Sequence, residues 1–191
     1  GSPITFTNIS EPGVTYSADG STCDNSNSFY WQITGPSAGS VVSGSMGSDN
    51  SFPDDFQGWT SGTSPLEMQF SVPGNYQIKL KIANLCNIDS STLNFCVVAK
   101  PQPQFTINPT TGCFPPNLDV ATTNNTVVTP NPCFATTYAS TWSASPATGW
   151  TFSSGNASSS NPGFRFAAAG TYIISLDTRV NGLTACSAST T

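Results

Sequence analysis

Apolar and polar residues alternate along most of this chain, in short runs that clusters of Gly, Pro and Asn separate. Residues 74–83 show the pattern clearly, because every second side chain is large and apolar (Tyr76, Ile78, Leu80, Ile82). A period of two places such side chains on one face of a β-strand, and no segment has a sustained period of 3.6 residues. The pattern therefore predicts an all-β protein built from short antiparallel strands, arranged as β-sandwiches.

The predicted strands fall into two groups. In the first half they lie near residues 4–8, 28–34, 66–72, 75–84 and 91–99. In the second half they lie near 104–108, 117–123, 137–144, 149–153, 163–167, 171–180 and 184–190. Between the halves, the two prolines of Lys100-Pro101-Gln102-Pro103 block strand pairing and stiffen a short linker. We therefore expect one domain at residues 3–100 and a second at 101–191, held end to end.

The two halves repeat each other. Val72-Pro73-Gly74-Asn75-Tyr76-Gln77-Ile78-Lys79-Leu80 recurs as Ala168-Ala169-Gly170-Thr171-Tyr172-Ile173-Ile174-Ser175-Leu176. Upstream, Trp31 and Trp142 each stand in the middle of a predicted strand, where we expect core positions. Gly-Trp-Thr also occurs once in each half, at Trp59 and at Trp150. One building block used twice is typical of a modular array.

The repeat also exposes differences between the halves. Trp31 precedes Tyr76 by 45 residues, whereas Trp142 precedes Tyr172 by 30, so the first half carries an insertion at about residues 40–56. Pro3-Ile4-Thr5-Phe6-Thr7 matches the second strand of the later half, which predicts that the first strand of the first domain is missing. Thr191 falls inside the expected last strand of the second domain, which we expect to be truncated.

Composition narrows the choice of partner and compartment. Only 8% of the 191 residues are charged, and the formal net charge is -5. So few basic residues cannot neutralise a row of phosphates, which argues against nucleic acid and anionic membranes. No apolar run is long enough for a membrane span, and Gly1-Ser2 is interpreted as a cloning remnant. Six cysteines without histidine or metal-ligand spacing indicate disulfides in an oxidising compartment.

Catalysis is disfavoured by the same composition. Without histidine, the chain has neither a Ser-His-Asp nor a Cys-His arrangement. Asp54 and Asp55 are adjacent, and neighbours in sequence do not hold two carboxylates on opposite sides of a glycosidic bond. We expect a non-enzymatic protein.

Two kinds of binding site remain open. Asp49, Asp54 and Asp55 lie in the insertion and offer the oxygen ligands that Ca²⁺ prefers, the alternative being a solvated loop of turn-forming residues. No other cofactor is expected. Trp59 and Trp150 follow glycines beside Ser/Thr-rich loops and would suit stacking on a sugar ring. The alternative is that each ring covers an open end of its sandwich.

Several of these motifs resemble the polycystic-kidney-disease (PKD) type of immunoglobulin-like domain. The likeness covers most of both halves, and it rests on Asn108-Pro109-Thr110-Thr111-Gly112-Cys113-Phe114-Pro115, on Trp142 and on Gly170-Thr171-Tyr172. More narrowly, the chain is similar to the tandem domains in very large surface proteins of gliding Bacteroidota. The resemblance implies two tandem PKD-like β-sandwiches that serve as spacer or adhesive modules on a cell surface.

The resemblance also implies a disulfide scheme. In such a sandwich the loops after the second and the sixth strands lie at one end, which pairs Cys23 with Cys86 and Cys133 with Cys186. Cys96 and Cys113 either join across the linker or bond partners outside this segment.

Two functions of different classes follow. The first is a non-enzymatic piece of a secreted adhesin on the exterior of the bacterial outer membrane, acting as stalk or adhesive module in attachment and gliding. Its partners would be an extracellular surface or polysaccharide and the neighbouring repeats of the same chain. The second is a carbohydrate-binding accessory of a secreted polysaccharide-degrading enzyme.

Overall fold

The structure, a computed structural model, describes residues 2–11, 27–84, 87–135 and 137–191. It divides the chain into two compact units, Gly1–Val97 (unit 1) and Val98–Thr191 (unit 2), just ahead of the expected linker. Both units are all-β with antiparallel pairing, which confirms the predicted fold class. In the described residues the one helical element is a short 3₁₀ turn, η1 (Phe56–Gly58), and no helix is long enough to cross a bilayer.

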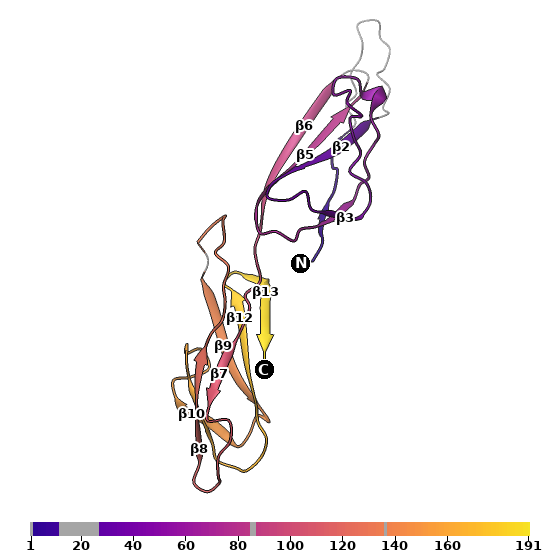
Figure 1. The fold of residues 1–191 in the computed structure, drawn as a ribbon. Coiled ribbons are helices and arrows are strands. Elements are labelled where there is room, and N and C mark those ends of the chain that lie inside the picture. The colour runs from indigo at the N-terminus through magenta and orange to yellow at the C-terminus, as the bar shows by residue number, and fades with distance from the viewer. Residues whose placement is uncertain (1, 12–26, 85–86, 136) are drawn as a thin grey trace, which may run out of the picture. The chain divides into compact units, whose positions relative to one another are not determined.

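Within its described residues, unit 1 contains two three-stranded sheets. One has the order β1-β4-β3 and the other β2-β5-β6, and the latter three strands run side by side in Figure 1. The strands are β1 (Ile4–Phe6), β2 (Ser28–Thr34), β3 (Ser40–Ser43), β4 (Leu66–Gln69), β5 (Gly74–Ala83) and β6 (Ile88–Val97).

The described part of unit 2 contains a four-stranded and a three-stranded sheet. Their orders are β10-β11-β8-β7 and β13-β12-β9. The strands are β7 (Phe105–Asn108), β8 (Leu118–Asn124), β9 (Tyr138–Ser145), β10 (Trp150–Ser154), β11 (Gly163–Phe166), β12 (Ile173–Val180) and β13 (Leu183–Thr190).

In each unit the core lies between the two sheets, because alternate residues of both sheets meet there. The unit 1 core joins Phe6, Leu66 and Met68 of one sheet to Trp31 and Ile78 of the other. In unit 2 the core likewise takes residues from both sheets (Val120, Phe164 and Phe166; Trp142, Ala144, Ile174 and Leu176). The expectation that Trp31 and Trp142 are core residues is confirmed, since they are 5% and 1% exposed.

The structure adds two details that the sequence pattern did not predict. The strand β3 was not predicted, and it lies in the segment that was interpreted as an insertion. Its residues are all exposed and carry no alternating apolar pattern, so the period of two does not reveal it. The two Gly-Trp-Thr motifs are not equivalent either. Trp150 opens β10 and packs against the core between the sheets, whereas Trp59 belongs to a separate cluster with Tyr30 and Ala83.

Candidate functional site

The paired tryptophans hold the same position in both units. The indole Nε1 of Trp31 donates a hydrogen bond to the carbonyl oxygen of Thr63 at 3.1 Å, and that of Trp142 donates to the carbonyl of Ser159 at 3.0 Å. Each bond ties the loop ahead of β4 or β11 to the opposite sheet. Burying the ring while satisfying its N–H makes these tryptophans framework residues.

The paired tyrosines behave in the same way. The hydroxyl of Tyr76 donates to the carbonyl of Val72 at 2.7 Å, and that of Tyr172 to the carbonyl of Ala168 at 3.4 Å. In both cases the acceptor lies four residues upstream, so the bond closes the turn that leads into β5 or β12. The repeat in the sequence is thus a repeat of side-chain contacts.

Residues 49–59, which include the end of the insertion, lie over the outer face of the sheet β2-β5-β6. Since side chains alternate along β2, Tyr30 points away from the main core that holds Trp31. Tyr30, Trp59 and Ala83 form a second buried cluster there, with Phe56 and Ile88 packed against it. The rings of Tyr30 and Trp59 meet edge to face, with centroids 4.8 Å apart.

This segment, called loop 49–59 below, is held by polar contacts. The indole Nε1 of Trp59 donates to the carbonyl of Phe52 at 2.8 Å. Lys81 Nζ donates to the carbonyl of Pro53 at 3.0 Å and lies 5.4 Å from the centroid of the Trp59 ring. Asn50, whose φ of 52° is left-handed, donates from Nδ2 to the Thr60 hydroxyl at 2.8 Å. Loop 49–59 is therefore cross-linked within itself and attached to β5 through Lys81.

Phe52 is the exposed large hydrophobic residue of loop 49–59. Its N–H donates to the carbonyl of Asp49 at 2.8 Å, and its carbonyl accepts from the N–H of Asp55 at 3.1 Å as well as from Trp59. Its side chain is nevertheless 57% exposed. A large ring on a fully bonded backbone loses little conformational entropy when it meets a partner, which makes Phe52 the strongest contact candidate in unit 1.

Two of the three aspartates of the candidate calcium site, Asp49 and Asp55, accept separate hydrogen bonds. Asp49 accepts from the Tyr30 hydroxyl at 3.3 Å and from the N–H of Ser51 at 3.1 Å. Burial, with the neighbouring Asp49 carboxylate, raises the pKa of Tyr30. Asp55 caps η1 by accepting from the N–H of Gln57 at 3.2 Å. The described residues hold no group of three or more acidic or cysteine side chains placed to bind a metal ion.

Neither tryptophan proposed for sugar stacking presents a free ring. Trp59 is 7% exposed beneath loop 49–59. Trp150 is half-buried, packs on Phe152 and Phe164 with centroids 5.3 and 5.2 Å away, and donates from Nε1 to the carbonyl of Pro146. Both rings pack within their own unit, Trp59 on the outer face of a sheet and Trp150 against the core between the sheets.

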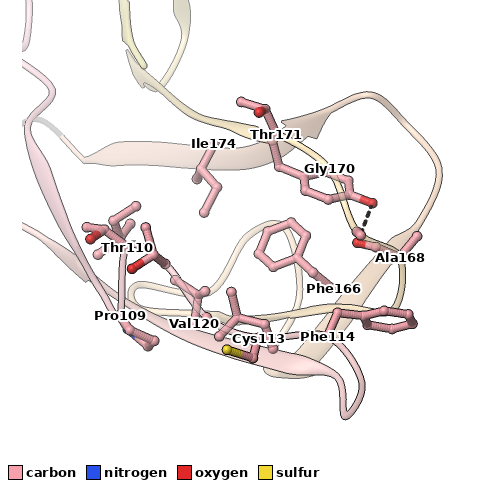
Figure 2. Close-up of a pocket in the computed structure, with 16 residues that line it drawn as sticks. Pro109, Thr110, Cys113, Phe114, Val120, Phe166, Ala168, Gly170, Thr171 and Ile174 are labelled. Carbon is pink, nitrogen blue, oxygen red and sulfur yellow. Dashed lines mark hydrogen bonds between the residues drawn. The ribbon is translucent and has the colours of Figure 1, made fainter.

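Unit 2 has a cavity of about 480 Å³ between the β7–β8 connection and the β11–β12 connection. Figure 2 shows Phe166 and Ile174 at this cavity and the Cys113 sulfur at its edge. Phe114, which also lines it, is 48% exposed. The lining is mainly apolar, so the cavity offers little beyond hydrophobic contact to orient a ligand.

The cysteines depart from the scheme that the resemblance implied. Cys96 and Cys133 each take part in a disulfide, whereas Cys113 and Cys186 are free thiols. The structure therefore forms neither a Cys133–Cys186 bond nor a Cys96–Cys113 bond. Cys186 lies within β13, which begins at Leu183, and not in the preceding turn where the scheme requires it. The expected Cys23–Cys86 bond lies outside the described residues.

No protein-family model matches the chain, and no curated protein matches it.

Phe52, the candidate contact residue, was not predicted from the sequence, because only tryptophans were considered as exposed rings. Its position in the insertion, between Asp49 and Asp54, was the available signal.

Proposed function

We propose that the chain is a pair of PKD-like, immunoglobulin-type modules of a secreted bacterial surface adhesin. The modules act without catalysis, as stalk and adhesive elements in attachment and gliding outside the outer membrane. The observation that carries the proposal is that one framework is built twice, with the same tryptophan and tyrosine contacts. Repetition of a complete framework suits a protein that spans distance, because each copy adds length without new chemistry.

Strand order supports the immunoglobulin-type assignment. If the strands of unit 2 are lettered A to G along the chain, its sheets have the orders D-E-B-A and G-F-C. These are the sheets of the constant-type immunoglobulin sandwich, in which a tyrosine at the start of strand F bonds back to the chain upstream. Tyr172 stands at that place in unit 2 and Tyr76 in unit 1.

A stalk must resist pulling, and single-molecule force spectroscopy tests this role. The chain is stretched between its ends under reducing conditions, so that disulfides do not limit extension. We expect two abrupt unfolding events, each releasing roughly 30 nm of chain. Unfolding should be abrupt because pulling along the strands must break several hydrogen bonds of a β-ladder together. Smooth extension at low force would therefore contradict the mechanical role.

The adhesive contact of this proposal is Phe52 on loop 49–59. Beads that carry the chain would be washed on polystyrene, agarose and cellulose, and retention compared between wild type and Phe52→Ala. Phe114→Ala in unit 2 is the matched control, since Phe114 is exposed to a similar extent, 48% against 57%. We expect Phe52→Ala alone to lower retention severalfold.

The same assay separates the second candidate function. The observation that favours carbohydrate binding is the exposed Phe52 ring, flanked by Asp54 and Asp55 as acceptors for sugar hydroxyls. Loss of retention on agarose or cellulose but not on polystyrene would favour the accessory module. Equal retention of wild type and Phe52→Ala on all surfaces would contradict both functions for this loop.

A further inference from the structure

The strand β1 of unit 1 is equivalent to β8 of unit 2. Ile4 pairs with Met68 as Val120 pairs with Phe164, which aligns Ile4-Thr5-Phe6-Thr7-Asn8 with Val120-Ala121-Thr122-Thr123-Asn124. Both strands end in the same turn. Asn8 Oδ1 accepts from the N–H of Ser10 at 2.9 Å, and Asn124 Oδ1 accepts from the N–H of Thr126 at 3.0 Å.

In unit 2 the outer edge of β8 is covered by the chain's own β7. The ladder runs from Phe105 opposite Asn124 to Asn108 opposite Ala121. It continues beyond the strands, since the N–H of Asn125 donates to the carbonyl of Gln104 at 2.7 Å. Gln102 and Val127 exchange two further backbone bonds, of 2.9 and 3.0 Å. Alternate residues from 121 to 127 thus direct their backbone groups at this added strand.

In unit 1 the corresponding edge carries no strand within the described residues, because β1 is the last strand of the sheet β1-β4-β3. By the alignment, the backbone groups of Thr5, Thr7 and Ile9 occupy the places that bind β7 in unit 2. The side chain of Ile9 is 86% exposed, the largest exposed fraction among the exposed large hydrophobic residues of the described chain. An apolar side chain beside unpaired backbone is a template for strand addition.

The interior of unit 1 is closed without an added strand. Phe6 stands where unit 2 has Thr122, and its ring lies 6.4 Å from that of Trp31 and 5.5 Å from that of Phe95. It is 7% exposed. In unit 2 the ring of Phe105, from β7, contacts the equivalent tryptophan, Trp142, at 5.2 Å. The edge in unit 1 is therefore formed before any partner arrives.

We propose that the edge from Thr5 to Ile9 binds an extended polypeptide segment of the β7 type as an additional antiparallel strand. The partner is defined by chemistry: an uncharged segment with apolar residues at alternate positions, as Phe105 and Ile107 stand in β7. Main-chain hydrogen bonds supply the affinity of such a complex, and the alternating side chains supply its register. The inference concerns this edge alone and does not depend on the adhesive role of Phe52.

The test uses the whole chain and a fluorescent peptide of residues 102–109. Binding is followed by anisotropy, and amide NMR signals locate the site. We expect saturable binding, with the largest changes in amide chemical shift at Thr5, Thr7 and Ile9. Methylating the backbone nitrogen of Thr106 should weaken binding by about tenfold or more, because that N–H faces the docked edge. Methylating the nitrogen of Ile107, which faces solvent, is the matched control and should leave binding unchanged.

A protein variant gives a second readout. Thr7→Pro removes one edge-facing N–H and should abolish binding, whereas Thr7→Ser keeps that N–H and should bind like wild type. If Thr7→Pro fails to fold, the two methylated peptides still decide. The proposal is overturned if the unmodified peptide does not bind, if both methylated peptides bind equally, or if the shifts map to unit 2. It is also overturned if the chain dimerises through this edge, since the occupant would then be a second copy.

Discussion

Trp59 and Phe52 lie in the same loop and share a hydrogen bond, yet they have opposite surroundings. The bond runs from the indole of Trp59 to the carbonyl of Phe52. Trp59 is 7% exposed, in edge-to-face contact with Tyr30, whereas Phe52 is 57% exposed. The buried ring fastens loop 49–59 to the sheet, and the exposed ring is what the loop presents.

This difference in burial predicts a large loss of stability for one substitution and almost none for the other. Trp59→Ala should lower the free energy of unfolding of unit 1 by about 3–5 kcal/mol, because it leaves a cavity beside Tyr30. Phe52→Ala should change it by no more than about 0.5 kcal/mol. Urea unfolding of both variants measures the effects. Equal losses would show that the exposed ring also supports the fold.

The two free thiols should differ in reactivity. Cys113 is exposed beside the cavity of unit 2, whereas Cys186 is half-buried in β13. Because a reagent must reach the sulfur, we expect iodoacetamide to label Cys113 several times faster than Cys186 in the native chain. Peptide mapping after brief labelling measures the ratio, and unfolding in urea should equalise it. Faster labelling of Cys186 in the native chain would contradict the assigned exposures.

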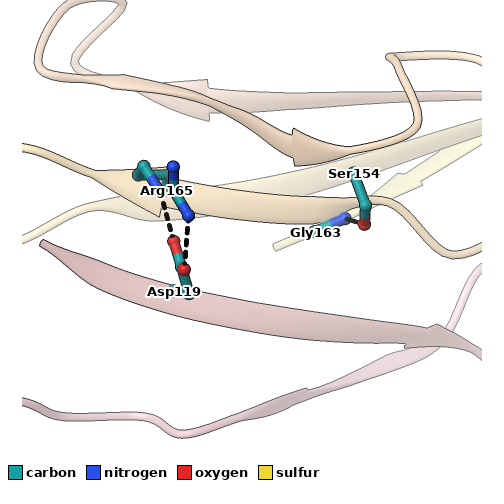
Figure 3. A network of polar contacts seen from close by, with 4 residues as sticks. All are labelled: Asp119, Ser154, Gly163 and Arg165. Carbon is teal, nitrogen blue, oxygen red and sulfur yellow. Dashed lines mark hydrogen bonds and ion pairs between the residues drawn. The ribbon is translucent and has the colours of Figure 1, made fainter.

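At the scale of elements, the strands β8 and β11 are joined by an ion pair in addition to their ladder. Arg165 Nε and Nη2 donate to the two carboxylate oxygens of Asp119 at 2.7 and 2.8 Å, as Figure 3 shows. The two residues are directly opposite in the register. The hydrogen bonds from Arg165, with its positive charge, lower the pKa of Asp119. The side chains are 47% and 52% exposed, so solvent screens the pair.

The direction of this pKa shift fixes a pH dependence. Because the folded-state pKa of Asp119 lies below its unfolded value, the ion pair stabilises unit 2 above the unfolded pKa. This contribution is lost as the pH falls through the folded-state pKa. Asp119→Asn should therefore melt slightly below wild type at pH 7, and the difference should vanish at the acid end. Thermal melts from pH 7 to 2 test this, and a difference that grows on acidification would contradict it.

At the scale of the whole molecule, each unit has its own core. Leu66 of unit 1 and Leu176 of unit 2 are both fully buried, in two clusters that share no residue. The free energy that each core supplies therefore belongs to its own unit.

Separate cores predict separate losses. Leu66→Ala should destabilise unit 1, and Leu176→Ala should destabilise unit 2, each by about 2–5 kcal/mol. Hydrogen exchange read by mass spectrometry assigns the loss to residues. We expect faster exchange in β4 and β5 for the first variant and in β9 and β12 for the second. Loss of protection across both units in either variant would show that they unfold together.

Much of the fold was predictable from local patterns. Alternation located β5 and β12 closely, because each is buried mainly on one face and the period of two follows directly. β3 carries no such alternation and was missed. Phe52, the candidate contact residue, was missed, because only tryptophans were considered as exposed rings, although its place between Asp49 and Asp54 was a local signal of exposure.

By itself, the sequence determined the all-β class, the repeat and the core positions of Trp31 and Trp142, because strand periodicity and duplicated motifs are local records of burial. Only the tertiary structure decided that Trp59 is buried and Phe52 exposed, that Asp49 and Asp55 accept separate hydrogen bonds, and that Cys186 is a free thiol. Each of these depends on which distant segment lies against a side chain, and that is settled by packing between elements.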